Sequence, residues 1–186
     1  VNIHEVLDRV RALAANGVAD GLTMRESYDP SLPPVWGDED QLIQIFLNLV
    51  KNAAEAAHSR GDGRGEVTIH TAFRHGVKVR ATNGQALRSA PLEIRITDNG
   101  PGVPADQQAL IFEKFRQGGD DSHRPAGTGL GLPISRQIIE HFGGRLWLER
   151  QDGAGARFVF ELPCLPAGSS GTRLGYRCSR GARVQC

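Results

Sequence analysis

Apolar residues recur along the chain with two different spacings, and each spacing predicts a different kind of element. A period of three to four residues, typical of helices that bury one side, occurs over residues 3–16, 38–61 and 132–144. The ends of these segments carry matching signals, since Asp38 can cap the second helix and Gly143 can end the third. We therefore expect three amphipathic helices.

Alternation of apolar and polar residues predicts strands in most of the remaining segments. The predicted strands cover residues 21–28, 66–73, 76–81, 91–97, 145–150 and 156–163. We expect 66–73 and 76–81 to pair as antiparallel neighbours, the last two strands to form a hairpin, and a short helix at 104–115. Helices and largely antiparallel strands are mixed rather than strictly alternating, which favours an α+β fold, a two-layer α/β sandwich.

The chain divides into a patterned body and an unpatterned tail. Residues 1–163 have the size of one domain. Residues 164–186 lack periodicity, contain four arginines and no acid, and are expected to be disordered. Because the whole chain has a formal charge of +1 and the tail holds four positive charges, the body carries −3. Such a mildly acidic body argues against nucleic acid as a partner, since nucleic-acid binding needs a basic face.

Other classes of protein are disfavoured by what the sequence lacks. No run of about 18 apolar residues occurs, so we expect no membrane span. All three cysteines, Cys164, Cys178 and Cys186, lie in the tail, which gives neither a disulfide framework nor a zinc pattern. A reducing cytoplasm is the simplest setting, and we expect the chain to be monomeric.

Two asparagines, Asn48 and Asn52, lie on one polar edge of the predicted helix 38–61. They can be solvated polar residues of an amphipathic helix, and taken by themselves this is the better interpretation. They can also direct amide oxygens at a hard cation such as Mg²⁺, which prefers oxygen ligands and keeps most of its waters.

An acid followed by two glycines stands at the end of the predicted strand 91–97. Asp98, Gly100 and Gly102 can form an ordinary turn. Alternatively, a buried carboxylate can accept a hydrogen bond from a ligand amine, such as the N6 amino group of adenine. In that case the glycines admit a flat ring close to the backbone.

Two further features follow along the chain. Phe112 and Phe115 are three residues apart, a spacing more often found in a core than in a binding site. Gly127, Gly129 and Gly131 precede the third predicted helix, where glycine-rich backbone gathers free N–H groups that suit phosphate. This Gly-x-Gly-x-Gly spacing is neither the dinucleotide fingerprint nor the Walker loop.

The order of these four features resembles that of the N, G1, F and G2 boxes in the ATP-binding domain of sensor histidine kinases. That domain belongs to a wider family with DNA gyrase, the MutL repair proteins and the heat-shock chaperone ATPases. The resemblance runs from about Asn2 to Pro163, and up to about Gly102 it is particularly like the nitrogen-regulation sensor kinases. It implies a Bergerat-type ATP-binding fold, in which a mixed sheet is covered on one face by about three helices.

The resemblance also implies a role for each matching residue, with ATP and Mg²⁺ as cofactors. Asn52 would bind Mg²⁺, Asp98 would hold the adenine amino group, and the segment 116–127 would form a lid over ATP. The other predicted ATP-binding residues are Asn48, Lys51, Gly100, Gly102, Phe112, Phe115, Arg116, Gly127, Thr128, Gly129, Leu130, Gly131 and Leu132.

Asn48 separates two kinds of activity within this family. Hydrolytic members carry a glutamate here as the general base for water, and an amide cannot accept that proton. The resemblance therefore favours transfer of the ATP γ-phosphate to a histidine. Both Asn48 and Asn52 are predicted catalytic residues.

The expected acceptor is a histidine on a separate dimerisation domain, because no histidine of this chain stands in the family's acceptor setting. His4, in particular, is expected to be an exposed helix residue. We thus expect a protein-histidine kinase domain that cannot phosphorylate itself. Its partners would be a dimerisation domain and a response regulator, in nitrogen-regulation-type signalling.

Two alternative functions stay open. Many sensor kinases have Lys or Arg where this chain has Glu55. This departure suggests a nucleotide-binding regulatory module without transfer activity. A hydrolytic ATPase of the gyrase or MutL type is the other alternative, which Asn48 disfavours.

Overall fold

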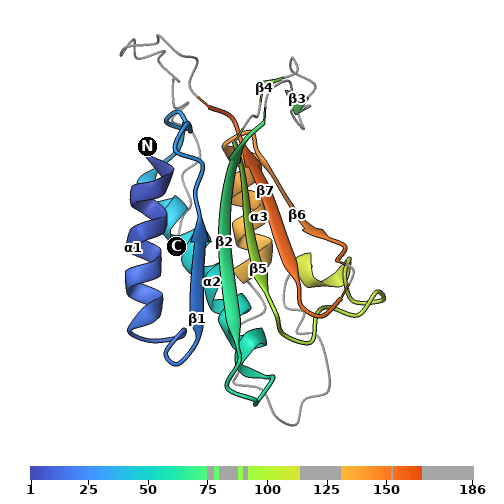
Figure 1. Cartoon of the computed structure of the whole chain (residues 1–186). Helices are drawn as coiled ribbons and strands as arrows, with labels where there is room; N and C mark the ends of the chain where they lie inside the picture. Colours follow the sequence, from blue (N-terminus) through green and yellow to red (C-terminus); the bar gives the residue numbers. More distant parts are fainter. Residues whose placement is uncertain (75–77, 80–87, 90–91, 114–130, 152, 165–186) are drawn as a thin grey trace, which may run out of the picture.

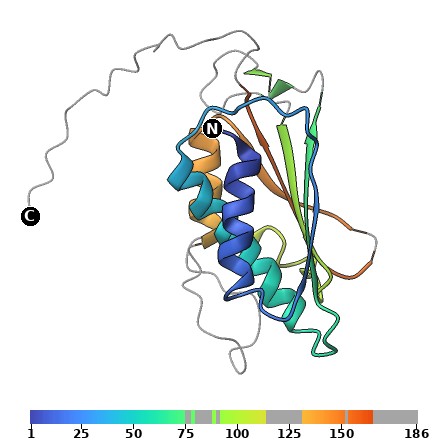
Figure 2. The ribbon, with the colours of Figure 1, turned by 60° about the vertical axis from the view of Figure 1, so that its left-hand side comes forward.

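Helices and strands occupy separate layers of the molecule (Figures 1 and 2). The computed structural model describes residues 1–74, 78–79, 88–89, 92–113, 131–151 and 153–164. Within these residues the helices are α1 (Ile3–Ala15), α2 (Glu39–His58) and α3 (Gly131–His141), with a short 3₁₀ helix, η1 (Leu110–Phe112). The strands are β1 (Thr23–Ser27), β2 (Glu66–Phe73), β3 (Lys78–Val79), β4 (Arg88–Ser89), β5 (Leu92–Asp98), β6 (Arg145–Glu149) and β7 (Arg157–Leu162).

A mixed sheet forms one layer of the described structure. Its strand order is β1-β2-β5-β7-β6, with β1 parallel to β2 and the other neighbours antiparallel. Helices α1, α2 and α3 lie on one face of this sheet (Figure 2). The predicted α+β sandwich, with a mixed sheet covered on one face by helices, is therefore confirmed.

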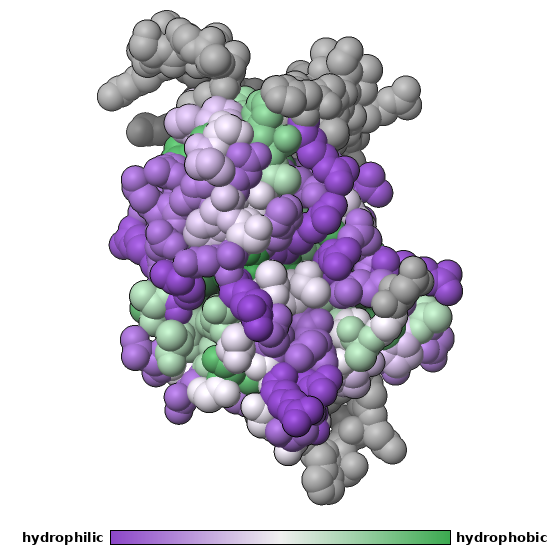
Figure 3. Space-filling view, viewed as in Figure 1, coloured by the Kyte–Doolittle hydropathy of each residue, from purple (hydrophilic) through white to green (hydrophobic). Residues whose placement is uncertain are grey.

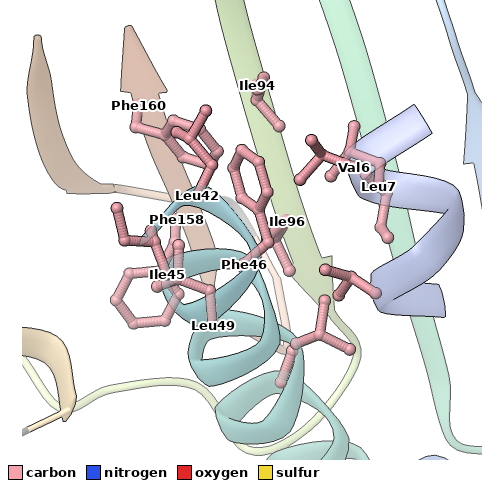
Figure 4. Packing of buried hydrophobic residues seen from close by; sticks show 14 of the residues in the cluster. Val6, Leu7, Leu42, Ile45, Phe46, Leu49, Ile94, Ile96, Phe158 and Phe160 are labelled. Carbon is pink, nitrogen blue, oxygen red and sulfur yellow. The ribbon is translucent and has the colours of Figure 1, made fainter. Parts of the chain in front are cut away.

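Helix α2 follows the predicted pattern closely. Its first turn is capped by Asp38, whose side chain accepts a hydrogen bond from the backbone N–H of Gln41 at 3.0 Å. The apolar side packs on the sheet, where the ring of Phe46 lies 5.0 Å from that of Phe160 between centroids (Figure 4). The buried residues of α2 include Leu42, Ile45, Phe46, Leu49, Val50 and Ala53. This packing leaves the polar edge that carries Asn48 facing α3.

The other face of the sheet is polar. Ion pairs lie on this side, between Arg74 and Glu93 at 3.0 Å and between Arg157 and Glu149 at 3.0 Å. Figure 3, which looks onto this face, shows a largely hydrophilic surface. The alternation along the strands thus separates the apolar core from a mainly polar face, as is common in largely antiparallel sheets.

The predicted antiparallel pairing of 66–73 with 76–81 is wrong. β2 pairs with β1 and β5, whereas the two-residue β3 pairs with β4 in a separate small sheet. β2 and β5 match over seven residue pairs, which place Ile69 opposite Ile96 on the face that the helices cover. The longer match buries more apolar surface, and this outweighs closeness in sequence.

Over its described residues, 104–113, the expected short helix 104–115 is reduced to turns and the 3₁₀ helix η1. The backbone N–H of Gln107 donates to the carbonyl of Pro104, and that of Leu110 donates to the carbonyl of Gln107, each at 2.9 Å. Both bonds join residues three apart, a pattern that short connecting segments commonly adopt. The segment therefore serves as a connector between β5 and the residues that follow.

His4 is not the exposed helix residue that the sequence predicts. It is half-buried, and its ring stacks on Tyr28 with the centroids 4.9 Å apart. Its Nε2 lies 3.1 Å from the hydroxyl oxygen of Thr71 on β2. Because α1 lies over this part of the sheet, the side chain is covered by neighbours from β2 and from the segment that follows β1.

The described chain continues one residue beyond the predicted domain boundary at residue 163. Cys164 forms an isolated antiparallel bridge with Val35, and burial raises the pKa of its thiol to about 11. The predicted disorder of the tail concerns residues outside the described part, so the division into 1–163 and 164–186 stays a prediction.

Candidate nucleotide-binding site

Residues predicted to bind a nucleotide come together from three elements. Asp98 ends β5, and the loop after it packs on α2 so closely that a Cβ on Gly100 would overlap the backbone oxygen of Ala56. Gly131, the first residue of α3, is equally close to α2, because a Cβ there would overlap the side chain of Asn48. The fold thus gathers the strand-end acid, the helix amides and the last glycine of the predicted phosphate loop.

Asp98 is a buried acid with one oxygen engaged by the protein. Its side chain lies on the helix-covered face of β5, and the residue is 3% exposed. Oδ1 accepts hydrogen bonds from the backbone N–H of Gly100 at 2.8 Å and of Ala156 at 3.3 Å. Burial raises the pKa of Asp98 above its ordinary value, while these two N–H donors act in the opposite direction. Oδ2 takes part in neither bond, so it can accept a hydrogen bond from a ligand amine.

We predict that the affinity for ATP falls at acidic pH because Asp98 becomes protonated. Protonation removes the charged acceptor, and the raised pKa of Asp98 moves that loss to a higher pH than for an ordinary aspartate. Affinity should be full above the raised pKa and decrease as the pH falls through it. The stability of the ligand-free domain should change in the opposite direction. The stabilising contribution of Asp98 is fully present below the pKa that this residue has in the unfolded chain, and it is lost as the pH rises through the raised pKa of the folded chain.

Calorimetric titration with ATP between about pH 4 and pH 8 checks this dependence. The same titration of Asp98→Asn separates the effect of Asp98 from the titration of ATP itself. An equal fall of affinity in both proteins would contradict the prediction.

Glycines around Asp98 are required by the packing of the protein itself. Gly102 has a φ of +80°, and a Cβ on it would lie 2.9 Å from the carbonyl oxygen of Gly155. Gly155 has a φ of +101°, and a Cβ there would overlap the backbone of Asp98. These close approaches hold the β6–β7 turn against the end of β5. The close approach of a nucleotide base to Gly100 and Gly102 stays a prediction.

The helix amides differ in their surroundings. Asn48 donates from Nδ2 to the hydroxyl oxygen of Ser135 at 3.0 Å, which ties α2 to α3. Asn52, one turn further along α2, is half-buried. Lys51 is exposed and forms an ion pair at 3.9 Å with Glu55, the residue that stands where many sensor kinases have Lys or Arg.

Phe112 is half-buried and packs against the core at the edge of this region. Its ring meets that of Phe158 edge to face, 6.4 Å apart at 79°, and the guanidinium of Arg136 lies 5.2 Å from its centre. Leu132, on α3, is also half-buried and packs against the core. The other predicted ATP-binding residues lie outside the described residues: Phe115, Arg116, Gly127, Thr128, Gly129, Leu130 and the lid 116–127.

Two neighbours of the site were not among the predicted residues. Ala156 contributes only its backbone N–H, for which a side-chain pattern carries no signal. Ser135 could have been found, because it occupies the buried side of α3 four residues before Ile139, where the helical pattern calls for an apolar residue. A buried hydroxyl at such a position needs a polar partner.

A cavity of about 520 Å³ lies next to the site. It is lined by the segment after Asp98, the end of β6 and the β6–β7 turn, including Val103, Gln107, Leu148 and Gln151. Its lining includes Gly102 but not Asp98, Asn48 or Asn52. The cavity therefore adjoins the predicted site without being its centre.

Within the part of the chain that the structure describes, no group of three or more His, Cys, Asp or Glu side chains could hold a metal ion. Nor does this part contain a helix long and apolar enough to cross a membrane.

The fold is that of an ATP-binding domain of the kinase and gyrase type. Residues 37–166 match the family of histidine kinase-, DNA gyrase B- and HSP90-like ATPases, and since this is more than half of the chain, the protein belongs to that family.

Known relatives narrow the class further. The sensory histidine kinase/phosphatase NtrB of Rhizobium leguminosarum bv. phaseoli is 45% identical over 152 residues, which are 82% of this chain and 38% of that protein. NtrB of Azospirillum brasilense is 44% identical over 162 residues, again 38% of its length. The chain thus spans well under half the length of the curated relatives it matches.

A solved structure shares the fold. Full-length ShkA, crystallised in complex with AMPPNP, superposes with a TM-score of 0.67 and 29% identity over 88% of this chain and 30% of that one. The predicted family and the resemblance to nitrogen-regulation sensor kinases are confirmed.

Proposed function

We propose that this chain is the catalytic, ATP-binding domain of a two-component sensor histidine kinase of the nitrogen-regulation type. It transfers the γ-phosphate of ATP to a histidine on a separate dimerisation domain. The observation that carries this proposal is the grouping of the buried acid Asp98 with the α2 amides Asn48 and Asn52, in a chain 45% identical to an NtrB kinase.

In this proposal the nucleotide is held at its two ends by different groups. Asp98 accepts from the adenine amino group with Oδ2, because Oδ1 is occupied by backbone donors. The phosphate end is held by Lys51, by Arg116 and by the segment 127–132.

Magnesium fits the donor set on α2. Asn52 presents a half-buried amide oxygen one turn from Asn48, and hard oxygen donors of this kind suit an ion that keeps several waters. When bound, Mg²⁺ would neutralise charge on the phosphates during transfer. Asn52 is its proposed ligand.

Asn48 directs the reaction away from hydrolysis. Its amide donates to Ser135 and has no basic site to take a proton from water. A histidine acceptor brings its own nucleophilic nitrogen, so no base at this position is needed for transfer.

The proposed partners follow from the length of the relatives. Because the chain spans 38% of each NtrB protein, the dimerisation and phosphoacceptor domain belongs to the remainder of such a kinase. A response regulator then receives the phosphoryl group. The setting is the cytoplasm, and the domain by itself is a monomer.

A regulatory module that binds nucleotide without transferring phosphate is the second candidate. The ion pair between Lys51 and Glu55 favours it, since it engages a cation that could otherwise contact phosphate.

The test mixes this chain with a dimerisation-domain fragment of NtrB and ATP labelled on the γ-phosphate. We expect phosphohistidine on the fragment, and none when Asn52→Ala replaces the parent chain. ATP binding without any phosphohistidine would contradict the kinase assignment and support the regulatory module. Steady release of inorganic phosphate from the chain by itself would point to a hydrolytic ATPase.

A further inference from the structure

Ser135 is a buried polar residue on the helix that follows the predicted phosphate loop. It is 2% exposed, and its hydroxyl oxygen accepts the hydrogen bond from Asn48 Nδ2 at 3.0 Å. The two residues are 87 positions apart, so the bond joins α2 to the first turns of α3. Its neighbours Pro133 and Ile139 show that this side of α3 is otherwise apolar.

The amide of Asn48 is confined from two directions. Ser135 holds its nitrogen, while Gly131 lies so close that any Cβ there would overlap the amide group. A glycine on one side and a hydroxyl on the other leave the side chain little freedom to rotate. An amide that can reach α3 in only one way also holds the two helices in register at this point.

We infer that Ser135 is a positioning residue for the magnesium-dependent part of ATP binding, acting through Asn48. The inference rests on the proposed function. By holding Asn48 against Gly131, Ser135 sets how closely the end of the glycine-rich segment approaches the face of α2 that carries Asn52. Groups that hydrogen-bond to metal- and phosphate-binding residues commonly change affinity or activity about tenfold or more when removed.

The inference separates the two ends of the nucleotide. Asp98 is held by backbone N–H groups of Gly100 and Ala156, and neither bond involves α3. Loss of the Ser135 hydroxyl should therefore leave the adenine end unaffected. Only the contribution of Mg²⁺ to binding should fall.

The test is calorimetric binding of ATP to the whole chain, once with Mg²⁺ and once with a chelator. We expect Ser135→Ala to weaken binding of ATP with Mg²⁺ about tenfold and to leave metal-free binding unchanged. Gln137→Ala, an exposed position on the same helix, is the matched control and should change neither value. Thermal unfolding of each variant shows that the domain stays folded.

A double-mutant cycle shows whether Ser135 acts through Asn48. In the Asn48→Ala background, Ser135→Ala should have little further effect, because the partner of the hydroxyl is already gone. Additive effects would overturn the inference, as would unchanged Mg²⁺-dependent affinity in Ser135→Ala or an equal loss of metal-free binding. A parent chain that binds no ATP under either condition would instead overturn the proposed function, and this inference with it.

Discussion

Replacing Asp98 by asparagine should weaken ATP binding by about 10- to 100-fold, since a hydrogen bond to a charged group contributes about 1.5–3 kcal/mol. In the parent chain Oδ2 takes part in neither backbone hydrogen bond, so it is the expected acceptor for a ligand amine. In the variant an NH₂ group takes its place and faces another donor. A site built for one amino group loses most of its selectivity when the acceptor is removed.

The orientation of the new amide is determined by the protein. The backbone N–H groups of Gly100 and Ala156 both point at Oδ1, so the asparagine must turn its oxygen toward them. This keeps both internal hydrogen bonds and the side-chain volume. The variant should therefore fold, and removing a buried charge should even favour the ligand-free state near neutral pH, because burial raises the pKa of Asp98.

Calorimetry with ATP and thermal unfolding measure the two effects of Asp98→Asn separately. Asp106→Asn is the control, because Asp106 is an exposed acid in the segment that follows. Its affinity should match the parent value. Unchanged affinity in Asp98→Asn would contradict adenine recognition by this residue.

Truncating Phe46 to alanine should lower the free energy of unfolding by about 3–5 kcal/mol. The ring is fully buried at the centre of the core, 5.0 Å from Phe160 and next to the isoleucines of β5 (Figure 4). Its removal leaves a cavity between α2 and the sheet that rigid neighbours cannot fill. Since whole domains are stable by only about 5–15 kcal/mol, this is a large fraction.

Denaturant unfolding followed by circular dichroism measures the effect of Phe46→Ala. Leu13→Ala is the matched control on α1, where the side chain is 58% exposed and the change should stay within about 0.5 kcal/mol. If Phe46→Ala lowers the free energy of unfolding no more than Leu13→Ala does, the packing of α2 does not depend on this contact.

Several elements were predictable because their signals are local. The segment 38–61 carries its own cap and its own apolar side, and both act within one or two turns of the helix. The strands 66–73 and 91–97 follow from alternation, which reports which side chains face the core. The pairing of strands is not a local property. The strand β3 follows β2 in sequence but pairs with β4, because β5 offers β2 a longer apolar match.

The residues of the candidate site can be divided in the same way, into those that local patterns predict and those that depend on long-range contacts. Asp98, Asn48 and Asn52 could be named from the sequence, because each follows a recognisable local pattern and their order resembles that of a known family. Ser135 and Ala156 could not be assigned as their partners, since these hydrogen bonds join residues 87 and 58 positions apart. Such contacts exist only once the chain has closed around its core.

By itself, the sequence determined the family, the three amphipathic helices and the chemical groups available for a nucleotide. Only the tertiary structure decided which oxygen of Asp98 is held by backbone donors, that Asn48 is held by α3, and that His4 is covered rather than exposed. The physical reason is that periodicity encodes burial. The direction of a buried polar group is set instead by donors and acceptors that other segments bring to it.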